Sequence, residues 1–548
     1  MPRLGPLLPL LALTCGCTSG NRPTSPPDGG VTQAAALTPP PPPPGGTIEM
    51  HPEVVRPRAN TRSALGTNLA ETTETDRSWA FLDLMAMSRT LISKSPERWG
   101  DGRSLNLDEN GYPTRMAEDQ EAVTLVPGGP GGPYVLTYQG RGEVKVGALE
   151  SQHRVVSEAP GRITVELIRD QPFVVTILKT DPKDHVRDVK ILPKGLAPDA
   201  RDLAFHPLFL ERVGQFRILR FMDWTVTNSS QVRRWSERSR PVFQTQAQAG
   251  GIAYEWIIRL ANTVHADPWI CVPHLADDDF VDQLARLLKF NLDPDLKVYV
   301  ELSNELWNTH PAFSQSAHAG AEGLRLGLSR DPKQARLFWQ ARRSQEVFQI
   351  FERVYGPEHK QRLVRVVASQ LGNTWAHEKL LGFEDLRAHT DALAVAPYFD
   401  IGEAGLEAIE QLKAPDLAWL FDRLERVDLP EKIKWMTLSR EVAEDSGLPL
   451  IAYEGGQHLV THPAFFEDLE LQARYDEANR DPRMKALYLR FLEGWKKAGG
   501  HEFVHYTFAR HYNHHNRFAM LEHLDDPREQ APKYDAILTF SATHPPWW

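Results

Sequence analysis

The sequence feature that most constrains the fold is a run of β-forming residues, at positions 297–308, that ends abruptly in a carboxylate. Within it Val298, Val300 and Leu302 alternate with other side chains, which is the period of two expected of a strand. The run then breaks into an Asn-Glu pair, Asn304 and Glu305. The pattern predicts a strand that presents an acidic side chain at its carboxyl end. In a barrel of alternating strands and helices, catalytic groups lie at that end.

A second run of the same kind ends in Glu454, and strand-like runs alternate with helix-like segments along most of the chain. We expect helices over residues 79–92, 207–215, 253–262, 280–290, 337–354 and 485–498. We expect strands over residues 64–69, 217–224, 269–274, 297–305, 363–368, 392–398, 448–454 and 502–507. Because the count closes at eight, the sequence predicts an α/β fold, a (β/α)8 TIM barrel, with Glu305 on strand 4 and Glu454 on strand 7.

The sequence changes character between residues 96 and 205. Short alternating segments, separated by turns rich in Gly, Pro and Asp, lie at 134–138, 143–146, 162–168 and 173–178. They predict an antiparallel β module inserted between barrel strands 1 and 2, with the barrel formed by residues 49–95 and 206–548. Such a module can bind carbohydrate or serve as a structural flank, and the sequence leaves both open.

The amino-terminal segment resembles the signal of a bacterial lipoprotein. Arg3 precedes an apolar run, and Cys17 follows Gly16 at the end of residues 1–17. Residues 18–48 are a proline-rich linker. We therefore expect lipidation of Cys17 and export to the bacterial cell envelope, at the outer membrane or cell surface; an ordinary signal peptide is the alternative. No later stretch is apolar enough to span a bilayer, so membrane contact is expected through the anchor only.

Charge and cysteine content exclude two further possibilities. The formal net charge of -10 provides no basic surface for nucleic acid, so a nucleic-acid partner is not expected. Of the three cysteines, only Cys271 lies outside the signal region. It cannot form an intramolecular disulfide there, and its apolar neighbours predict an inert core residue.

At the two strand-end glutamates, the chain resembles the clan of retaining (β/α)8 glycoside hydrolases, which includes many cellulases, mannanases and β-galactosidases. That clan has Asn-Glu at the end of strand 4, matched by Asn304-Glu305, and a glutamate at the end of strand 7, matched by Glu454. The resemblance implies that Glu305 is the acid/base and Glu454 the nucleophile. Retention requires two such carboxyl groups about 5 to 5.5 Å apart, one of them protonated near neutral pH.

The resemblance also implies roles for supporting groups. Arg220 would keep the nucleophile ionised, although an ion pair with Asp223 is the alternative. Asn304 would bind the sugar 2-hydroxyl, and Tyr398 would donate to the nucleophile or merely pack at the rim of the barrel. Further substrate-binding candidates lie at other strand ends or in the loops beyond them: His274, Asp277, Trp224, Trp307, Gln370 and Tyr506.

Histidines cluster near the carboxyl terminus, at His505, His511, His514 and His515. Their spacing matches no helical pair followed by an acidic residue, so we expect a sugar-binding loop there and neither a metal nor another cofactor. The sequence as a whole predicts a retaining β-glycosidase that acts on a polysaccharide or oligosaccharide. The alternative is a catalytically inactive carbohydrate-binding protein on the same barrel.

Overall fold

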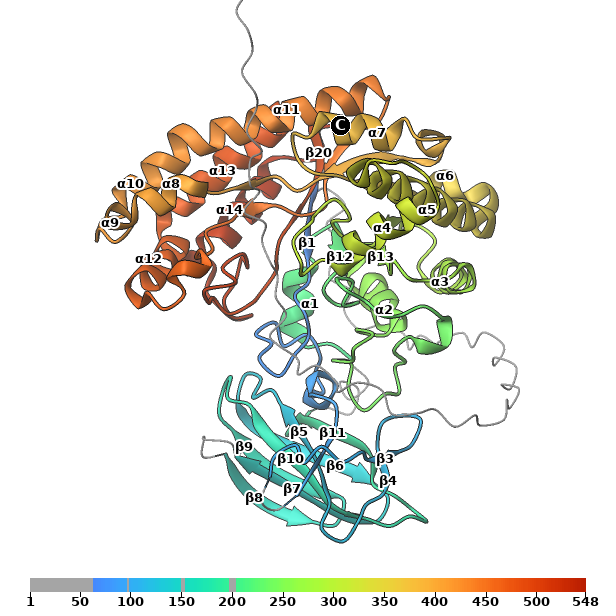
Figure 1. Cartoon of the computed structure of the whole chain (residues 1–548). Helices are drawn as coiled ribbons and strands as arrows, with labels where there is room; N and C mark the ends of the chain where they lie inside the picture. Colours follow the sequence, from blue (N-terminus) through green and yellow to red (C-terminus); the bar gives the residue numbers. More distant parts are fainter. Residues whose placement is uncertain (1–62, 96–97, 149–152, 197–203) are drawn as a thin grey trace, which may run out of the picture.

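The computed structural model describes residues 63–95, 98–148, 153–196 and 204–548. The expected signal peptide, Cys17 and the proline-rich linker lie outside these residues. Eight parallel strands form a closed barrel, which confirms the predicted fold class (Figure 1). In barrel order the strands are β1 (Leu65–Asn68), β12 (Ile218–Arg220), β13 (Asp267–Val272), β14 (Val298–Leu302), β15 (Leu363–Ala368), β16 (Ala392–Val395), β18 (Leu450–Ala452) and β20 (Gly500–His505).

The barrel closes where β1 pairs in parallel with β20, with Leu65 opposite Phe503. On its other side β1 pairs with β12, and this pairing requires a residue without a side chain at Gly66, because a Cβ there would lie 2.7 Å from the carbonyl oxygen of Ile218. Inside the barrel Trp269, Tyr299 and Tyr453 are fully buried. The barrel interior is therefore a packed core, and the site can form only at one end.

Helices cover the outside of the barrel (Figure 1). The principal ones are α1 (Pro207–Val213), α2 (Tyr254–Val264), α3 (Asp278–Asn291), α5 (Pro332–Tyr355), α7 (Thr374–Leu381), α11 (Leu429–Asp445), α13 (Pro482–Lys497) and α14 (Pro532–Thr543). Others lie in the connections: α4 (Ser314–Arg325), α6 (His359–Arg362), α8 (Gly402–Glu407), α9 (Ile409–Leu412), α10 (Ala418–Arg423) and α12 (Leu469–Arg480). Among the described residues, no helix combines the length and the apolar character needed to cross a membrane.

Between β1 and β12 the chain forms two four-stranded antiparallel sheets, as the sequence predicts. One has the order β2 (Ile92–Lys94), β5 (Glu121–Val126), β10 (Phe173–Thr180), β7 (Gly142–Ala148). The other has the order β11 (Arg187–Pro193), β6 (Gly132–Gln139), β9 (Arg162–Leu167), β8 (Arg154–Ala159). A small pair, β3 (Asn106–Leu107) and β4 (Pro113–Arg115), lies beside them.

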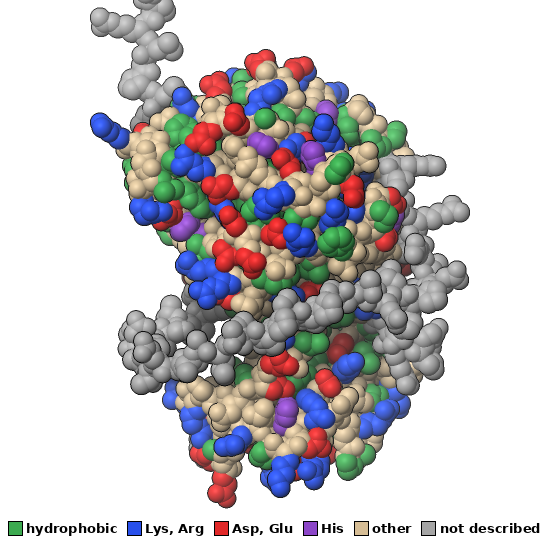
Figure 2. Space-filling view, turned by 90° about the vertical axis from the view of Figure 1, so that its right-hand side faces the viewer, with side chains coloured by type: hydrophobic (Ala, Val, Ile, Leu, Met, Phe, Trp, Pro, Cys, Tyr) green, Lys and Arg blue, Asp and Glu red, His purple; other side chains and the backbone are tan. Residues whose placement is uncertain are grey.

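The inserted sheets contact the barrel through charged groups. Arg169 forms an ion pair with Asp525, in the loops beyond β20, and Arg77 pairs with Asp170 at 2.7 Å. On the face shown in Figure 2, acidic and basic side chains are interspersed over both parts of the molecule. The insertion thus adjoins the end of the barrel that is formed by the carboxyl ends of its strands.

The helix predicted over residues 79–92 is wrong. The segment forms a single 3-10 turn, Leu84–Met87, before β2 begins at Ile92. Asp83 explains the difference, because its carboxylate accepts hydrogen bonds from the backbone N–H groups of both Met85 and Ile191. The apolar side chains of residues 79–92 therefore pack toward the inserted sheets, and their helical spacing was a misleading signal.

Candidate active site

Glu305 lies three residues beyond the end of β14. The chain turns sharply there, with positive φ angles at Ser303 and Glu305, a conformation that costs energy in residues other than glycine. The carboxyl group of Glu305 is buried and accepts hydrogen bonds from Asn308 Nδ2 (2.8 Å) and the Tyr453 hydroxyl (3.2 Å). Burial raises the pKa of Glu305 above its ordinary value, against these hydrogen bonds and the charge of Arg220, and the charge of Glu301 raises it further. Glu305 is thus suited to hold a proton.

Glu454 lies two residues beyond the end of β18 and has a different environment. Its carboxylate accepts a hydrogen bond from Arg220 Nη1 at 3.1 Å and another from the Tyr398 hydroxyl at 3.1 Å. A guanidinium and a phenol that both donate favour the anion. The two glutamates therefore have opposite environments, one suited to the acid and the other to the carboxylate.

Arg220 connects the members of the site. It is fully buried, and besides Glu454 it donates to the side-chain oxygens of Asn68 (3.1 Å) and Asn304 (2.8 Å). Its Nε and Nη2 both donate to Glu301, at 3.1 and 2.9 Å. Arg220 pairs with Glu301 and Glu454, so the alternative of an ion pair with Asp223 is not what the structure shows.

Glu301 is a member of the site that sequence reasoning missed. It lies inside the barrel, 1% exposed, and its Oε2 also accepts from Trp269 Nε1 at 2.8 Å. The thiol of Cys271 lies 3.5 Å from the same oxygen. A glutamate at an inward-facing position of β14, just before the Asn304-Glu305 pair, was the available signal, because a buried carboxylate requires a cationic partner.

Two side chains link Glu305 to the end of β18, where Glu454 lies. Tyr453, which precedes Glu454, donates to Glu305, and the indole N–H of Trp307 donates to the Tyr453 hydroxyl at 3.2 Å. Asn304 lies between Arg220 and Asn228, with its Nδ2 3.1 Å from Asn228 Oδ1. Of the predicted residues, the structure brings Arg220, Glu454, Asn304 and Tyr398 together in one hydrogen-bonded group, and Glu305 and Trp307 in a second group around Tyr453. Asn68 joins the two groups, because its Nδ2 donates to the Tyr453 carbonyl oxygen at 3.1 Å while its Oδ1 accepts from Arg220.

Other predicted binding residues lie at strand ends outside these groups. The hydroxyl of Tyr506 donates to Asp223 at 3.0 Å, and burial raises the pKa of Asp223 to about 6. Gln370 accepts a hydrogen bond from Asn373 in the loop after β15. His274 is buried against His318. Its pKa is lowered to about 4, mainly by burial and to a smaller extent by the charges of His318 and Arg233.

Two predicted binding residues have structural positions instead. Trp224 is 1% exposed and packs among Phe81, Phe209 and Phe221, so it belongs to the hydrophobic core and cannot contact a sugar. Asp277 is the N-cap of α3, where its carboxylate accepts from the backbone N–H of Phe280. A strand-end position alone did not distinguish these roles.

The carboxyl-terminal histidines do not converge. His505 is buried and hydrogen-bonded to the Tyr488 hydroxyl at 3.1 Å, whereas the rings of His514 and His515 lie 4.0 Å apart, tilted to each other, beside Phe466. Within the described part of the chain, the residues whose donor atoms come close enough to hold a metal ion are His265, Asp293 and Asp295, which belong to loops before β13 and β14. That group lies at the opposite end of the strands from the glutamates.

No protein-family model matches this chain, and neither does any curated protein. Among solved structures, β-glucuronidase 2 of Bacteroides uniformis is 10% identical, with 82% of this chain and 50% of that chain covered and a TM-score of 0.34. The endo-β-1,4-mannanase of Thermotoga petrophila is 12% identical (61% and 73% covered, TM-score 0.32). A Bacteroidetes-affiliated GH5 cellulase is 10% identical (62% and 87% covered, TM-score 0.34). This chain thus spans half the length of the glucuronidase. Its own closed barrel, with Glu305 and Glu454 just beyond the carboxyl ends of two strands, defines it as a (β/α)8 barrel protein.

Proposed function

We propose that this protein is a retaining glycoside hydrolase that cleaves β-glycosidic bonds in a polysaccharide or oligosaccharide by double displacement. The observation that carries the proposal is the contrast between the two strand-end glutamates. Glu305 is buried with neutral donors and has a raised pKa, whereas Glu454 is paired with a guanidinium. A retaining glycosidase requires one proton donor and one anionic nucleophile on the same site.

In the first step, Glu454 attacks the anomeric carbon while Glu305 gives its proton to the departing glycosidic oxygen. The bond to the leaving group breaks, an ester to Glu454 forms, and Glu305 becomes anionic. In the second step, Glu305 takes a proton from water, whose oxygen attacks the anomeric carbon and releases Glu454. The proton and the carboxylate are thereby restored.

The neighbouring side chains support these steps. Arg220 and Tyr398 hold Glu454 ionised and oriented through their 3.1 Å hydrogen bonds. Asn304 is fixed by Arg220 and Asn228, which positions its amide for a sugar hydroxyl. Preorganised donors of this kind act most strongly on charge that develops in the transition state.

The proposal is tested on a panel of aryl β-glycosides and β-linked polysaccharides with the wild type and Glu454→Gln. Hydrolysis by the wild type that disappears in Glu454→Gln supports it. Binding of a polysaccharide without release of sugar by either protein would establish the alternative, an inactive carbohydrate-binding barrel. A crystal structure provides a second test, since retention predicts carboxyl oxygens about 5 Å apart, and a separation near 9 Å would indicate inversion.

We further propose that the chain is exported and anchored to the cell envelope through lipidated Cys17. The support is the signal-like sequence and the linker at residues 18–48. Mass spectrometry of the mature protein should show an acylated amino-terminal cysteine. An unmodified terminus produced by cleavage at another position would contradict this.

A further inference from the structure

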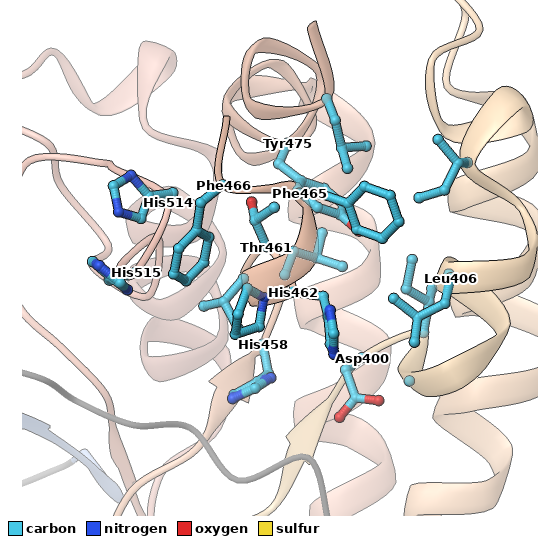
Figure 3. Close-up of a pocket in the computed structure, with 18 of the residues that line it drawn as sticks. Asp400, Leu406, His458, Thr461, His462, Phe465, Phe466, Tyr475, His514 and His515 are labelled. Atoms are coloured by element: carbon cyan, nitrogen blue, oxygen red, sulfur yellow. The ribbon is translucent and has the colours of Figure 1, made fainter. Parts of the chain in front are cut away.

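A cavity of about 250 Å³ lies among the loops that follow β14, β16, β18 and β20 (Figure 3). All four loops leave the carboxyl ends of barrel strands, so the cavity opens at the end that holds the two glutamates. His514 and His515, from the loop predicted to bind sugar, are part of its lining, whereas none of the other predicted substrate-binding residues lines it. It is therefore a second feature of this end of the barrel.

The cavity is connected to both glutamates by short chains of contacts. On one side, the backbone N–H of His310 in the wall donates to Asn308, whose amide donates to Glu305. On the other side, the ring of His458 packs against Tyr398 at a centroid distance of 5.6 Å, and Tyr398 donates to Glu454. A group attached to a sugar between the glutamates therefore has the cavity within reach.

The walls are mainly apolar. Figure 3 shows Phe465, Phe466 and Tyr475 on one side and Leu406 of α8 on the other. Leu459 and Leu471, both about 1% exposed, complete the lining. Phe466 is itself fixed by the rings of His514 and His515, each 4.6 Å away.

Several polar groups in the wall have partners of their own. Thr461 Oγ1 donates to Gln472 at 2.8 Å and accepts from Arg517 at 3.2 Å. Asp400 is paired with Lys432. His310 and His462 each accept a backbone N–H bond at Nδ1, so that nitrogen is occupied.

This distribution does not suit a further unsubstituted sugar. A pyranose carries several hydroxyl groups, and each one buried without a hydrogen-bond partner costs free energy. An apolar group gains free energy in proportion to the area it buries and makes no such demand. We propose that the cavity binds an apolar substituent, alkyl or aryl, carried by the substrate sugar, an inference that rests on the proposed hydrolase function.

The test measures chain-length dependence of binding by calorimetry, on Glu454→Gln protein so that no probe is consumed. The probes are n-hexyl and n-octyl β-D-glucopyranoside below their micellar concentrations. Each buried methylene should tighten binding about three- to fourfold, so the octyl compound should bind about tenfold more tightly. Leu406→Asp, which places a charge in the wall, should abolish that difference. The milder Leu406→Ser should reduce it.

The matched control is Leu324→Asp, because Leu324 lies on α4, is 43% exposed and does not line the cavity. It should preserve the chain-length effect. 6-O-hexanoyl and 6-O-octanoyl glucose form a second pair of probes. An effect confined to the alkyl glycosides places the apolar group on the leaving-group side, and one confined to the esters places it on the retained sugar.

Equal affinity for hexyl and octyl probes in both pairs would overturn the proposal, as would a chain-length effect unchanged in Leu406→Asp. The hydrolase proposal fails separately. A chain-length effect that depends on Leu406, in a protein that cleaves no glycoside of the panel, would retain the apolar site and reject the hydrolase. Hydrolysis without a chain-length effect would retain the hydrolase proposal and reject the apolar site.

Discussion

Glu301→Gln removes a buried negative charge and preserves the shape of the side chain. In the wild type, Arg220 directs two N–H groups to Glu301 and one to Glu454. Glu301 Oε1 is buried without a hydrogen-bond partner, so the new amide nitrogen can occupy that position while the remaining oxygen still accepts from Arg220. The substitution therefore changes charge with little change in geometry.

The magnitude follows from these contacts. The carboxylate accepts three hydrogen bonds, two from Arg220 and one from Trp269, and each should weaken by about 1 kcal/mol when the acceptor becomes neutral, so the loss of folding free energy should be about 3 kcal/mol. For a chain this large, that lowers Tm by at most about 12 °C. The loss lies at the low end of the about 3 to 5 kcal/mol expected when a buried charge loses its only partner, because Arg220 keeps Glu454.

The effect on catalysis has a definite sign. In the proposed mechanism Glu305 acts in its protonated form, so activity falls as pH rises through its pKa, and the charge of Glu301 is one of the causes that raise that pKa. Removing the charge lowers the pKa of Glu305 and shifts the alkaline limb of kcat/KM to lower pH. The assay is a pH profile on an alkyl glycoside, whose poor leaving group needs the proton, with Glu502→Gln as control, because Glu502 accepts from Tyr299 rather than Arg220. An alkaline limb that stays in place in Glu301→Gln would refute this reasoning.

Further predictions concern single side chains. Glu305→Ala should slow substrates with poor leaving groups most, since an activated aryl group departs with little protonation, and an equal loss on both types would contradict the acid role. Tyr398→Phe removes a hydrogen-bond donor to Glu454. kcat/KM should fall about 10- to 100-fold, and an unchanged value would show that Tyr398 only packs. Gly66→Ala should lower Tm, because its Cβ would lie 2.7 Å from a backbone oxygen. Gly147→Ala, whose Cβ would meet nothing nearer than 3.9 Å, should leave Tm unchanged, and equal Tm values for the two variants would contradict the packing of β1.

The barrel could be predicted because its strands carry a strong local signal. The predicted segment at 363–368 coincides with β15, and the segment at 297–305 contains β14. Loop helices such as α8 and α9 were missed because they are short and their apolar residues follow the cavity wall rather than a helical period. The segment 79–92 was misread because a tertiary hydrogen bond to Asp83 outweighed local propensity.

The site was predictable where a residue ends a strand and not where it lies inside the barrel. Glu305 and Glu454 follow apolar runs, which makes them visible in sequence. Glu301 occupies an inward-facing strand position that apolar residues usually fill, and its ion pair with Arg220 of β12 explains why a glutamate is there. Trp224 shows the converse error, because a strand-end position does not reveal whether a ring faces solvent or the core.

The assignment of roles to the two glutamates is tested most directly by the stereochemistry of azide rescue. In Glu305→Ala, azide can enter the space left by the acid/base and attack the glycosyl-enzyme, so NMR of the product should show a glycosyl azide of retained configuration. In Glu454→Ala, azide replaces the nucleophile itself and should give the inverted product. The reverse pattern, inversion with Glu305→Ala and retention with Glu454→Ala, would contradict the assignment of Glu305 as acid/base and Glu454 as nucleophile.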